Sequence, residues 1–168
     1  MRIILIGFMG VGKTSVGERL AKKLQFDFMD MDYKIEEIEN KKITEIFEKY
    51  GESYFRELEN KVIKEYIQHE NIVISTGGGI ITTKENIEIL KNEELVIFLD
   101  ANVETIIKHL SNEVNKRPLL KDNSNLYKKI EDLLSVRYEK YKDVCDISID
   151  INDKNIDEVI SQILVYIR

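Results

Sequence analysis

The sequence predicts an α/β protein whose mostly parallel sheet is covered by helices on both faces. Short apolar runs of strand length alternate with segments of helical periodicity along the chain. This alternation favours a parallel sheet, because parallel strands need long crossover connections, usually helices. At 168 residues the chain fits one domain, 1–168, and is long enough to bury a core.

Five strands are predicted from runs rich in isoleucine, valine, leucine and phenylalanine. The first run is rich in isoleucine, the second ends in acid, the third runs into three glycines, and the fourth is almost wholly apolar. In chain order they are Arg2–Ile6, Phe26–Asp30, Ile72–Ser75, Leu95–Asp100 and Asp146–Ile151.

Seven helices are predicted where apolar residues recur every three or four positions among charged ones. In chain order they are Lys13–Leu24, Ile35–Tyr50, Glu52–His69, Thr83–Lys91, Val103–Leu110, Leu126–Tyr141 and Ile156–Ile167. The polar segment Asn112–Asn125 holds the only proline, Pro118, and is predicted to be a mobile loop.

The composition argues against several classes of partner. Lys plus Arg number 25 against 31 Asp plus Glu, a net charge of −6, whereas a broad nucleic-acid surface needs a basic face. The apolar N-terminal run is too short to span a bilayer, and no other apolar stretch approaches that length. The single cysteine, Cys145, cannot form an internal disulfide, which suits a reducing compartment. We therefore expect a cytoplasmic protein without a nucleic-acid or membrane partner. We also expect a monomer.

The segment Gly7–Thr14 matches the phosphate-binding motif G-x-x-x-x-G-K-[ST] at each fixed position, between a predicted strand and a predicted helix. Its glycines let the backbone curl so that N–H groups and the positive end of the helix face a phosphate. Lys13 can reach the β- and γ-phosphates, and the Thr14 hydroxyl can ligate Mg²⁺. The motif predicts a nucleoside triphosphate site; the alternative is a glycine-rich turn that only closes the corner.

Two carboxylates, Asp30 and Asp32, follow the second predicted strand, at the edge where open α/β sheets bind ligands. Residues two apart share one face of a strand, so both are expected to project toward that crevice. One can hold Mg²⁺ through water, and the other can accept a proton or hydrogen bond from an attacking hydroxyl. The alternative is a solvated helix start that Asp32 caps.

Arg56, Arg117 and Arg137 stand out because most of the basic charge of the chain is lysine. An arginine can grip a carboxylate through paired N–H donors, which lysine cannot copy. The alternative for each is an intrahelical ion pair or a surface position. The glycines Gly77–Gly79 follow the third strand, where they either admit a ligand close to the backbone or form a flexible strand exit.

Together these segments resemble shikimate kinase. The matching segments, in the family's order and close to its spacing, are Gly7–Thr14, Phe28–Asp32, Ile46–Glu59, Ser75–Gly79, Arg117–Leu120 and Arg137–Tyr141. The resemblance covers nearly the whole chain. It implies a three-layer α/β/α P-loop kinase fold with a substrate-binding helical region at 32–70 and a mobile lid at 112–124.

The resemblance implies transfer of the ATP γ-phosphoryl to the 3-hydroxyl of shikimate, with Mg²⁺ as cofactor, in aromatic amino acid biosynthesis. The implied catalytic residues are Lys13, Asp32 and Arg117. The implied nucleotide-binding residues are Gly10, Val11, Gly12, Lys13, Thr14, Ser15 and Arg117, and the implied Mg²⁺ residues are Thr14 and Asp30. The implied shikimate-binding residues are Asp32, Phe47, Phe55, Arg56, Gly78 and Arg137, of which the two arginines would clamp the carboxylate.

Some positions depart from the family pattern. The loop ends in Lys13-Thr14-Ser15, where the family usually has Lys-Ser-Thr, and either hydroxyl can serve Mg²⁺. The family usually places an arginine against adenine; the nearest candidates here are Lys108 and His109.

Other functions stay open on the residues alone. A gluconate or nucleoside monophosphate kinase would use the same loop and turn Arg56 and Arg137 toward a different anion. A regulatory GTPase would need the signature Asn-Lys-x-Asp, and Asn40-Lys41-Lys42-Ile43 lacks the acid. A non-catalytic nucleotide-binding relic would need neither a base nor an arginine that stabilises the transition state.

Overall fold

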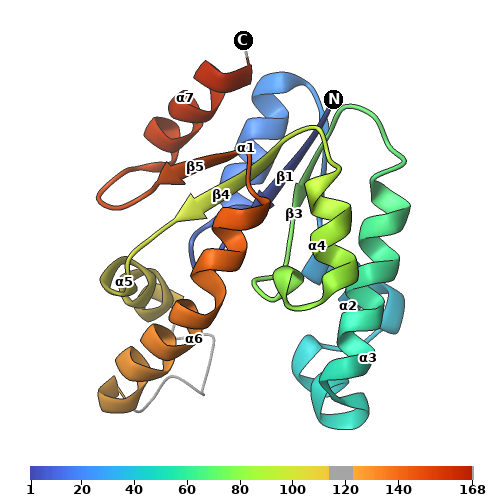
Figure 1. Ribbon diagram of the computed structural model, residues 1–168, viewed down its shortest axis with the longest axis vertical. Helices are drawn as coiled ribbons and strands as arrows, with labels where there is room; N and C mark the ends of the chain where they lie inside the picture. Colours follow the sequence, from blue (N-terminus) through green and yellow to red (C-terminus); the bar gives the residue numbers. More distant parts are fainter. Residues whose placement is uncertain (114–122, 168) are drawn as a thin grey trace.

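The computed structural model describes residues 1–113 and 123–167, which form one sheet between layers of helices (Figure 1). The strands are β1 (Arg2–Ile6), β2 (Asp27–Asp30), β3 (Ile72–Ser75), β4 (Val96–Asp100) and β5 (Ile147–Asp150). The helices are α1 (Lys13–Leu24), α2 (Met31–Glu39), α3 (Ile43–Tyr66), the 3-10 helix η1 (Ile80–Thr82), α4 (Lys84–Lys91), α5 (Val103–Glu113), α6 (Asn123–Val144) and α7 (Ile156–Ile167). The predicted α/β class is confirmed.

The sheet has the strand order β2-β3-β1-β4-β5, and each neighbouring pair is parallel. The central strand is β1, where Ile4 pairs with Ile74 of β3 on one side and with Val96 of β4 on the other. The connections that leave β1 and β3 run to opposite sides of the sheet. The carboxyl ends of these two strands therefore flank the place where open α/β sheets form a ligand crevice.

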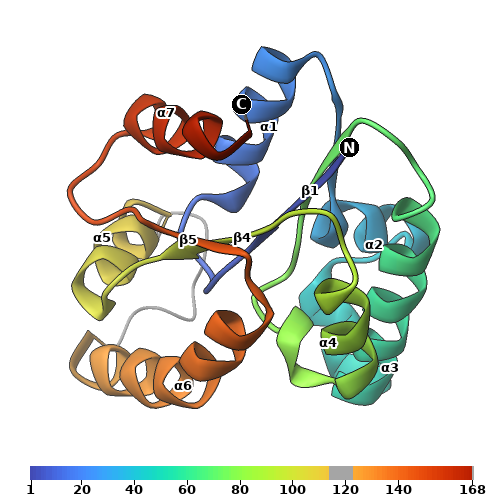
Figure 2. The same ribbon diagram turned by 45° about the horizontal axis from the view of Figure 1, so that its top comes forward.

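Alternate residues of the strands point into two separate cores. Ile3 and Leu5 of β1 pack with α1, α5 and α7, whereas Ile4 and Ile6 pack with α3 and α4, and all four side chains are fully buried. Figure 2 shows α1 and α7 above the sheet and α3, α4 and α6 below it. This arrangement confirms the predicted three-layer architecture. Within residues 1–113 and 123–167, no helix has the length and apolarity needed to cross a membrane.

The predicted single helix Ile35–Tyr50 is wrong, because the segment holds the end of one helix and the start of another. The first, α2, already begins at Met31, and Asn40 ends it in a left-handed conformation with φ 50°. The second, α3, contains Gly51, whose backbone is non-helical at φ 82° and ψ 174°, so two helical segments meet at a kink there. The predicted break between Tyr50 and Glu52 is therefore confirmed. Hydrophobic periodicity does not reveal the turn between α2 and α3, because its residues are polar and would fit the exposed face of a helix equally well.

Two helices extend into the predicted loop Asn112–Asn125. Helix α5 continues to Glu113, and α6 begins at Asn123. Arg117 and most of the predicted lid at 112–124 lie outside the described residues.

Candidate active site

The phosphate-binding loop joins β1 to α1 at the centre of the sheet. Its glycines adopt φ values of 147° at Gly7, 78° at Gly10 and 86° at Gly12, which favour glycine. Space also requires glycine, since a Cβ on Gly7 would lie 2.8 Å from the Leu99 carbonyl oxygen and one on Gly10 2.9 Å from a Leu110 methyl. The loop is thus held between β4 and α5, with the positive end of α1 directly behind it.

Lys13 lies at the start of α1 and folds back over this loop. Its Nζ donates hydrogen bonds to the carbonyl oxygens of Gly7 at 2.8 Å and Phe8 at 2.9 Å, and the residue is only 8% exposed. Burial lowers the pKa of Lys13 to about 8, against the attraction of Asp32 and Asp30, which raises it. The ammonium is therefore fixed within the curve of the loop, close to two carboxylates.

Thr14 and Asp30 meet beside the same loop. The Thr14 hydroxyl donates to Asp30 Oδ2 at 2.6 Å, while Asp30 Oδ1 accepts the backbone N–H of Tyr33 at 3.1 Å. Asp30 is thus the N-cap of α2, so the alternative in which Asp32 caps this helix is wrong. The strand-face argument is wrong as well, because Asp32 lies in the first turn of α2 rather than in β2.

The turn Gly77–Gly79 after β3 packs against residues from three other elements. A Cβ on Gly77 would lie 2.7 Å from Glu59 Oε1 and 2.9 Å from Asp32 Oδ1, and one on Gly78 would lie 3.1 Å from the backbone nitrogen of Met9. On Gly79, a Cβ would overlap the guanidinium of Arg56. Each glycine of this turn therefore permits a close approach, and the reading as a loose strand exit does not hold.

Arg56 extends from α3 to this turn and is paired with two glutamates of its own helix. Its Nη1 donates to Glu59 Oε2 at 2.5 Å, and its Nη2 and Nε donate to Glu52 Oε1 at 3.1 and 3.3 Å. The arginine side chain is 13% exposed, against 0% for Glu59 and 63% for Glu52. The predicted alternative of an intrahelical ion pair is thus present, although the guanidinium still lies at the glycine turn.

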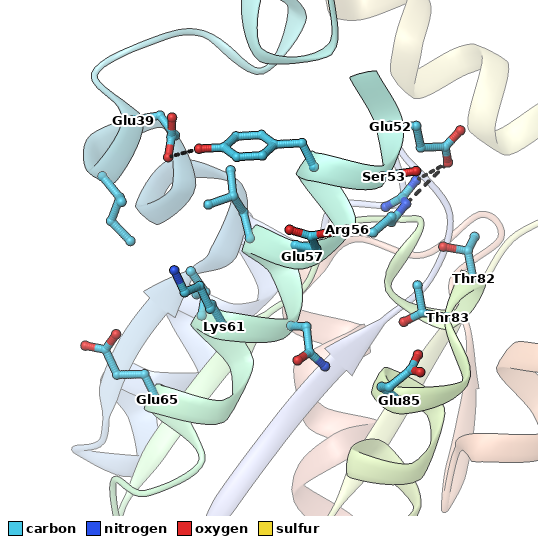
Figure 3. Close-up of a pocket in the computed structure, with 15 residues that line it drawn as sticks. Glu39, Glu52, Ser53, Arg56, Glu57, Lys61, Glu65, Thr82, Thr83 and Glu85 are labelled. Carbon is cyan, nitrogen blue, oxygen red and sulfur yellow. Dashed lines mark hydrogen bonds and ion pairs between the residues drawn. The ribbon is translucent and has the colours of Figure 1, made fainter. Parts of the chain in front are cut away.

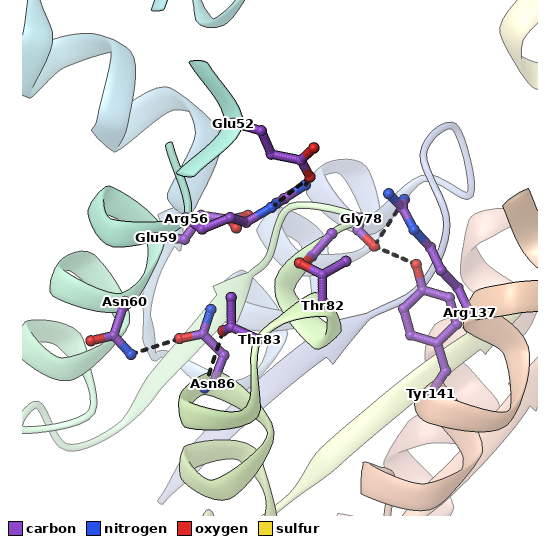
Figure 4. A network of polar contacts seen from close by, with 11 residues as sticks. Glu52, Arg56, Glu59, Asn60, Gly78, Thr82, Thr83, Asn86, Arg137 and Tyr141 are labelled. Carbon is purple, nitrogen blue, oxygen red and sulfur yellow. Dashed lines mark hydrogen bonds and ion pairs between the residues drawn. The ribbon is translucent and has the colours of Figure 1, made fainter. Parts of the chain in front are cut away.

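Arg137 reaches the same turn from α6 (Figure 4). Its Nη1 donates to the Gly78 carbonyl oxygen at 3.4 Å, and its guanidinium lies 5.9 Å from the ring centroid of Phe8. Tyr141, one turn further along α6, is fully buried and also donates to the Gly78 oxygen. The two arginines therefore contact adjacent glycines, Arg137 at Gly78 and Arg56 at Gly79.

Glu59 is a site residue for which the sequence indicated no role. Burial raises the pKa of Glu59 to about 7, and the attraction of Arg56 only partly opposes this. Its Oε1 has no hydrogen-bond partner among the described residues, and its charge also interacts with those of Asp32 and Arg137. The sequence does place Glu59 three residues after Arg56, and this spacing puts both side chains on one face of a helix, where they can form an ion pair.

This buried carboxyl predicts a pH-dependent stability. Folding raises the pKa of Glu59 from 4.5 to about 7, so the folded state holds the proton more tightly than the unfolded state. The stabilisation that results is complete below the unfolded pKa and is lost as pH rises through the folded pKa. Glu59→Gln cannot ionise, so its stability relative to the wild type should rise by up to about 3 kcal/mol between acid and pH 8. Urea unfolding of both proteins across this range measures the effect; a difference that does not vary with pH would contradict it.

Phe47 and Phe55 form an aromatic pair, and Phe55 lies beside Arg56. Their ring centroids lie 4.7 Å apart at an angle of 40°, and Phe55 is 4% exposed. The Arg56 guanidinium lies 5.4 Å from the Phe55 ring centroid. Phe55 thus lies next to the arginine, and Phe47 packs against Phe55.

A cavity of about 1040 Å³ opens on the other side of the phosphate-binding loop. Its lining includes Gly10, Val11, Gly12, Ser15, His109 and Ile151. His109 Nδ1 lies 2.7 Å from the Gly10 carbonyl oxygen, which ties α5 to the loop. Of the two residues predicted nearest to adenine, His109 is the one that lines this cavity.

Comparison with known proteins identifies relatives over nearly the full chain. The family model for shikimate kinase matches residues 9–168. The shikimate kinase of Clostridium botulinum (strain Eklund 17B / Type B) is 46% identical over 162 residues, which cover 96% of this chain and 94% of the relative.

Solved structures agree with this result. The shikimate kinase of Acinetobacter baumannii in complex with shikimate has a TM-score of 0.90 and 38% identity, covering 99% of this chain and 92% of that one. The shikimate kinase of Bacteroides thetaiotaomicron has a TM-score of 0.92 and 31% identity, with coverage of 99% and 98%. Fold, family model and sequence identity therefore agree, and the chain belongs to the shikimate kinase family.

Proposed function

We propose that this protein transfers the γ-phosphoryl group of ATP to the 3-hydroxyl of shikimate, a step of aromatic amino acid biosynthesis. The observation that carries the proposal is the meeting of Arg56 and Arg137 at one glycine turn, with Asp32 beside it and the phosphate-binding loop adjacent. Two guanidinium groups at one place suit a small organic acid. The names of the relatives and the shikimate bound in the Acinetobacter baumannii structure support the same substrate.

On the donor side, the loop from Gly10 to Ser15 is proposed to hold the ATP phosphates. Its backbone conformation and the helix end behind it suit an anion. Lys13 is proposed to exchange its bonds to two loop carbonyls for bonds to phosphate oxygens as the γ-phosphoryl moves. Because the ammonium already lies at the loop, it needs to move only a short way to reach the phosphate oxygens.

Mg²⁺ is proposed to bind at Thr14, with Asp30 in its outer shell. The donor set fits, since Mg²⁺ prefers hard oxygen ligands and keeps several waters, and the two side chains meet at 2.6 Å beside the loop. Among residues 1–113 and 123–167 no cluster of three His, Cys, Asp or Glu competes as a metal site. When bound, the ion supplies charge neutralisation for the phosphates.

On the acceptor side, Arg56 and Arg137 are proposed to bind the carboxylate of shikimate, with Gly78 offering its backbone and Phe47 and Phe55 forming an apolar wall. Asp32, which lies at Gly77 of the glycine turn, is proposed to orient the 3-hydroxyl and to accept its proton as the new P–O bond forms. The bond between the γ-phosphorus and the bridging oxygen breaks, and ADP leaves.

Arg117, on the lid at 112–124, is proposed to stabilise charge on the phosphates during transfer. The helical region at 32–70 is proposed as the shikimate-binding part of a single domain. We also propose a cytoplasmic monomer, which acts on small molecules rather than on nucleic acid, in keeping with its net charge of −6.

A coupled assay of ADP release with ATP and Mg²⁺ tests the proposed function. We expect rapid turnover with shikimate and only background release with gluconate, with a nucleoside monophosphate, or without an acceptor. The product is expected to be shikimate 3-phosphate, identified by mass spectrometry and ³¹P NMR. Faster turnover of gluconate than of shikimate would overturn the choice of acceptor, and nucleotide binding without turnover would favour a switch protein.

A further inference from the structure

We propose that Glu52 competes with the acidic substrate for Arg56. The Glu52 carboxylate pairs with Nε and Nη2 of Arg56 and must be displaced before a substrate carboxylate can bind these two donors. This inference rests on the proposed function, in which Arg56 receives the carboxylate of shikimate. It assigns Glu52 as a residue that sets the affinity of the site without touching the reacting atoms.

The geometry of the pair resembles that expected for a bound ligand. Glu52 Oε1 accepts hydrogen bonds from both Nη2 and Nε of Arg56, at 3.1 and 3.3 Å, so it occupies the side edge of the guanidinium. The other terminal nitrogen, Nη1, donates to Glu59 Oε2 at 2.5 Å. Arginine binds a carboxylate through two parallel N–H groups, and the pair formed by Nε and Nη2 is one of the two pairs that can do so. Glu52 therefore occupies a position that the carboxylate of a substrate needs.

The two glutamates differ in how easily they can leave. The Glu59 side chain is fully buried, whereas that of Glu52 is 63% exposed and can return to water. Glu52 also follows Gly51, the residue at which α3 kinks with φ 82°. A cavity of about 1070 Å³ along α3 is lined by Glu52 and Arg56, and the Glu52 carboxylate is open to solvent there (Figure 3). Glu52 is therefore the replaceable partner, and Glu59 is the permanent one.

Charge leads to the same conclusion. Two carboxylates surround the single positive charge of Arg56, so an acid that approaches meets repulsion from Glu52 until that side chain swings away. An ion pair whose carboxylate is 63% exposed contributes little stability. A substrate carboxylate can contact Arg137 as well as Arg56, whereas Glu52 contacts only Arg56. The substrate is therefore expected to bind Arg56 more tightly than Glu52 does and to displace it.

Calorimetric titration of shikimate into the wild type, Glu52→Gln and Glu57→Gln tests the inference. Glu57 is the matched control, since it is an exposed glutamate of the same helix with no hydrogen bond or ion pair to Arg56 among the described contacts. We expect Glu52→Gln to lower the Kd for shikimate about two- to fivefold, the range for an ion pair with a solvent-exposed partner, with the Kd for ATP unchanged in a parallel titration. An unchanged or higher Kd would overturn the inference, as would an equal gain in Glu57→Gln, which would indicate a long-range charge effect.

A double variant separates this inference from the proposed function. In an Arg56→Ala background, Glu52→Gln should give no gain, because the two residues act through one contact. If Arg56→Ala binds shikimate as tightly as the wild type, the proposed carboxylate site itself is wrong. If Arg56→Ala weakens shikimate binding but the single variant Glu52→Gln does not bind shikimate more tightly than the wild type, only the role of Glu52 is wrong.

Discussion

Replacement of Lys13 by methionine is expected to lower kcat for phosphoryl transfer about a thousandfold while the fold is retained, because a charged donor aimed at the transition state is lost. Methionine matches the length and apolar stem of lysine and lacks the charge. The ammonium of Lys13 lies within the curve of the phosphate-binding loop, bonded to the Gly7 and Phe8 carbonyls. No other lysine or arginine among the described residues contacts this loop through those carbonyls.

The fold of Lys13→Met is expected to survive for a related reason. Burial already lowers the pKa of Lys13 to about 8, so its charged form is disfavoured by the folded structure. An apolar side chain at an 8% exposed position removes that cost. The coupled ADP assay measures kcat, and circular dichroism with thermal melting checks the fold. Turnover near the wild-type rate in a folded variant would contradict the assignment of the phosphate-binding loop.

Truncation of either arginine is the change expected to have the largest effect on shikimate binding. Arg56→Ala and Arg137→Ala should each weaken it by about 2–4 kcal/mol, because each removes a charged hydrogen bond to a desolvated carboxylate. The affinity for ATP should stay at the wild-type value, since both side chains lie at the glycine turn rather than in the cavity beside Gly10. Calorimetric titration of each ligand separates the two effects.

The arginine variants need controls that isolate binding from folding. Arg56→Ala leaves the buried Glu59 without its ion-pair partner, so Arg56→Ala with Glu59→Gln removes the stranded charge and should recover stability without recovering binding. For Arg137, the control is Lys140→Ala, an exposed cation one turn along α6. Unchanged shikimate affinity in both arginine variants would remove these residues from the site.

Several parts of this protein were determined by the sequence alone because the physics that produces them is local. The motif from Gly7 to Thr14 needs specific residues at fixed spacing, and those residues impose the loop conformation wherever a strand and a helix flank it. The short apolar runs that alternate with helical segments likewise predicted each strand of the sheet. The break between α2 and α3 was missed because Asn40 is also compatible with a helix surface, so its role in ending α2 in the left-handed conformation was not evident from the polar pattern around it.

Tertiary structure alone decided how the scattered side chains of the site combine. Arg56 and Arg137 lie 81 positions apart in the chain, and they meet only because α3 and α6 both pack against the turn that follows β3. The burial of Glu59, and hence the rise in its pKa, depends on the same packing. Sequence spacing carries no information on desolvation, because the groups that exclude water from a carboxylate come from distant segments that only the folded chain brings together.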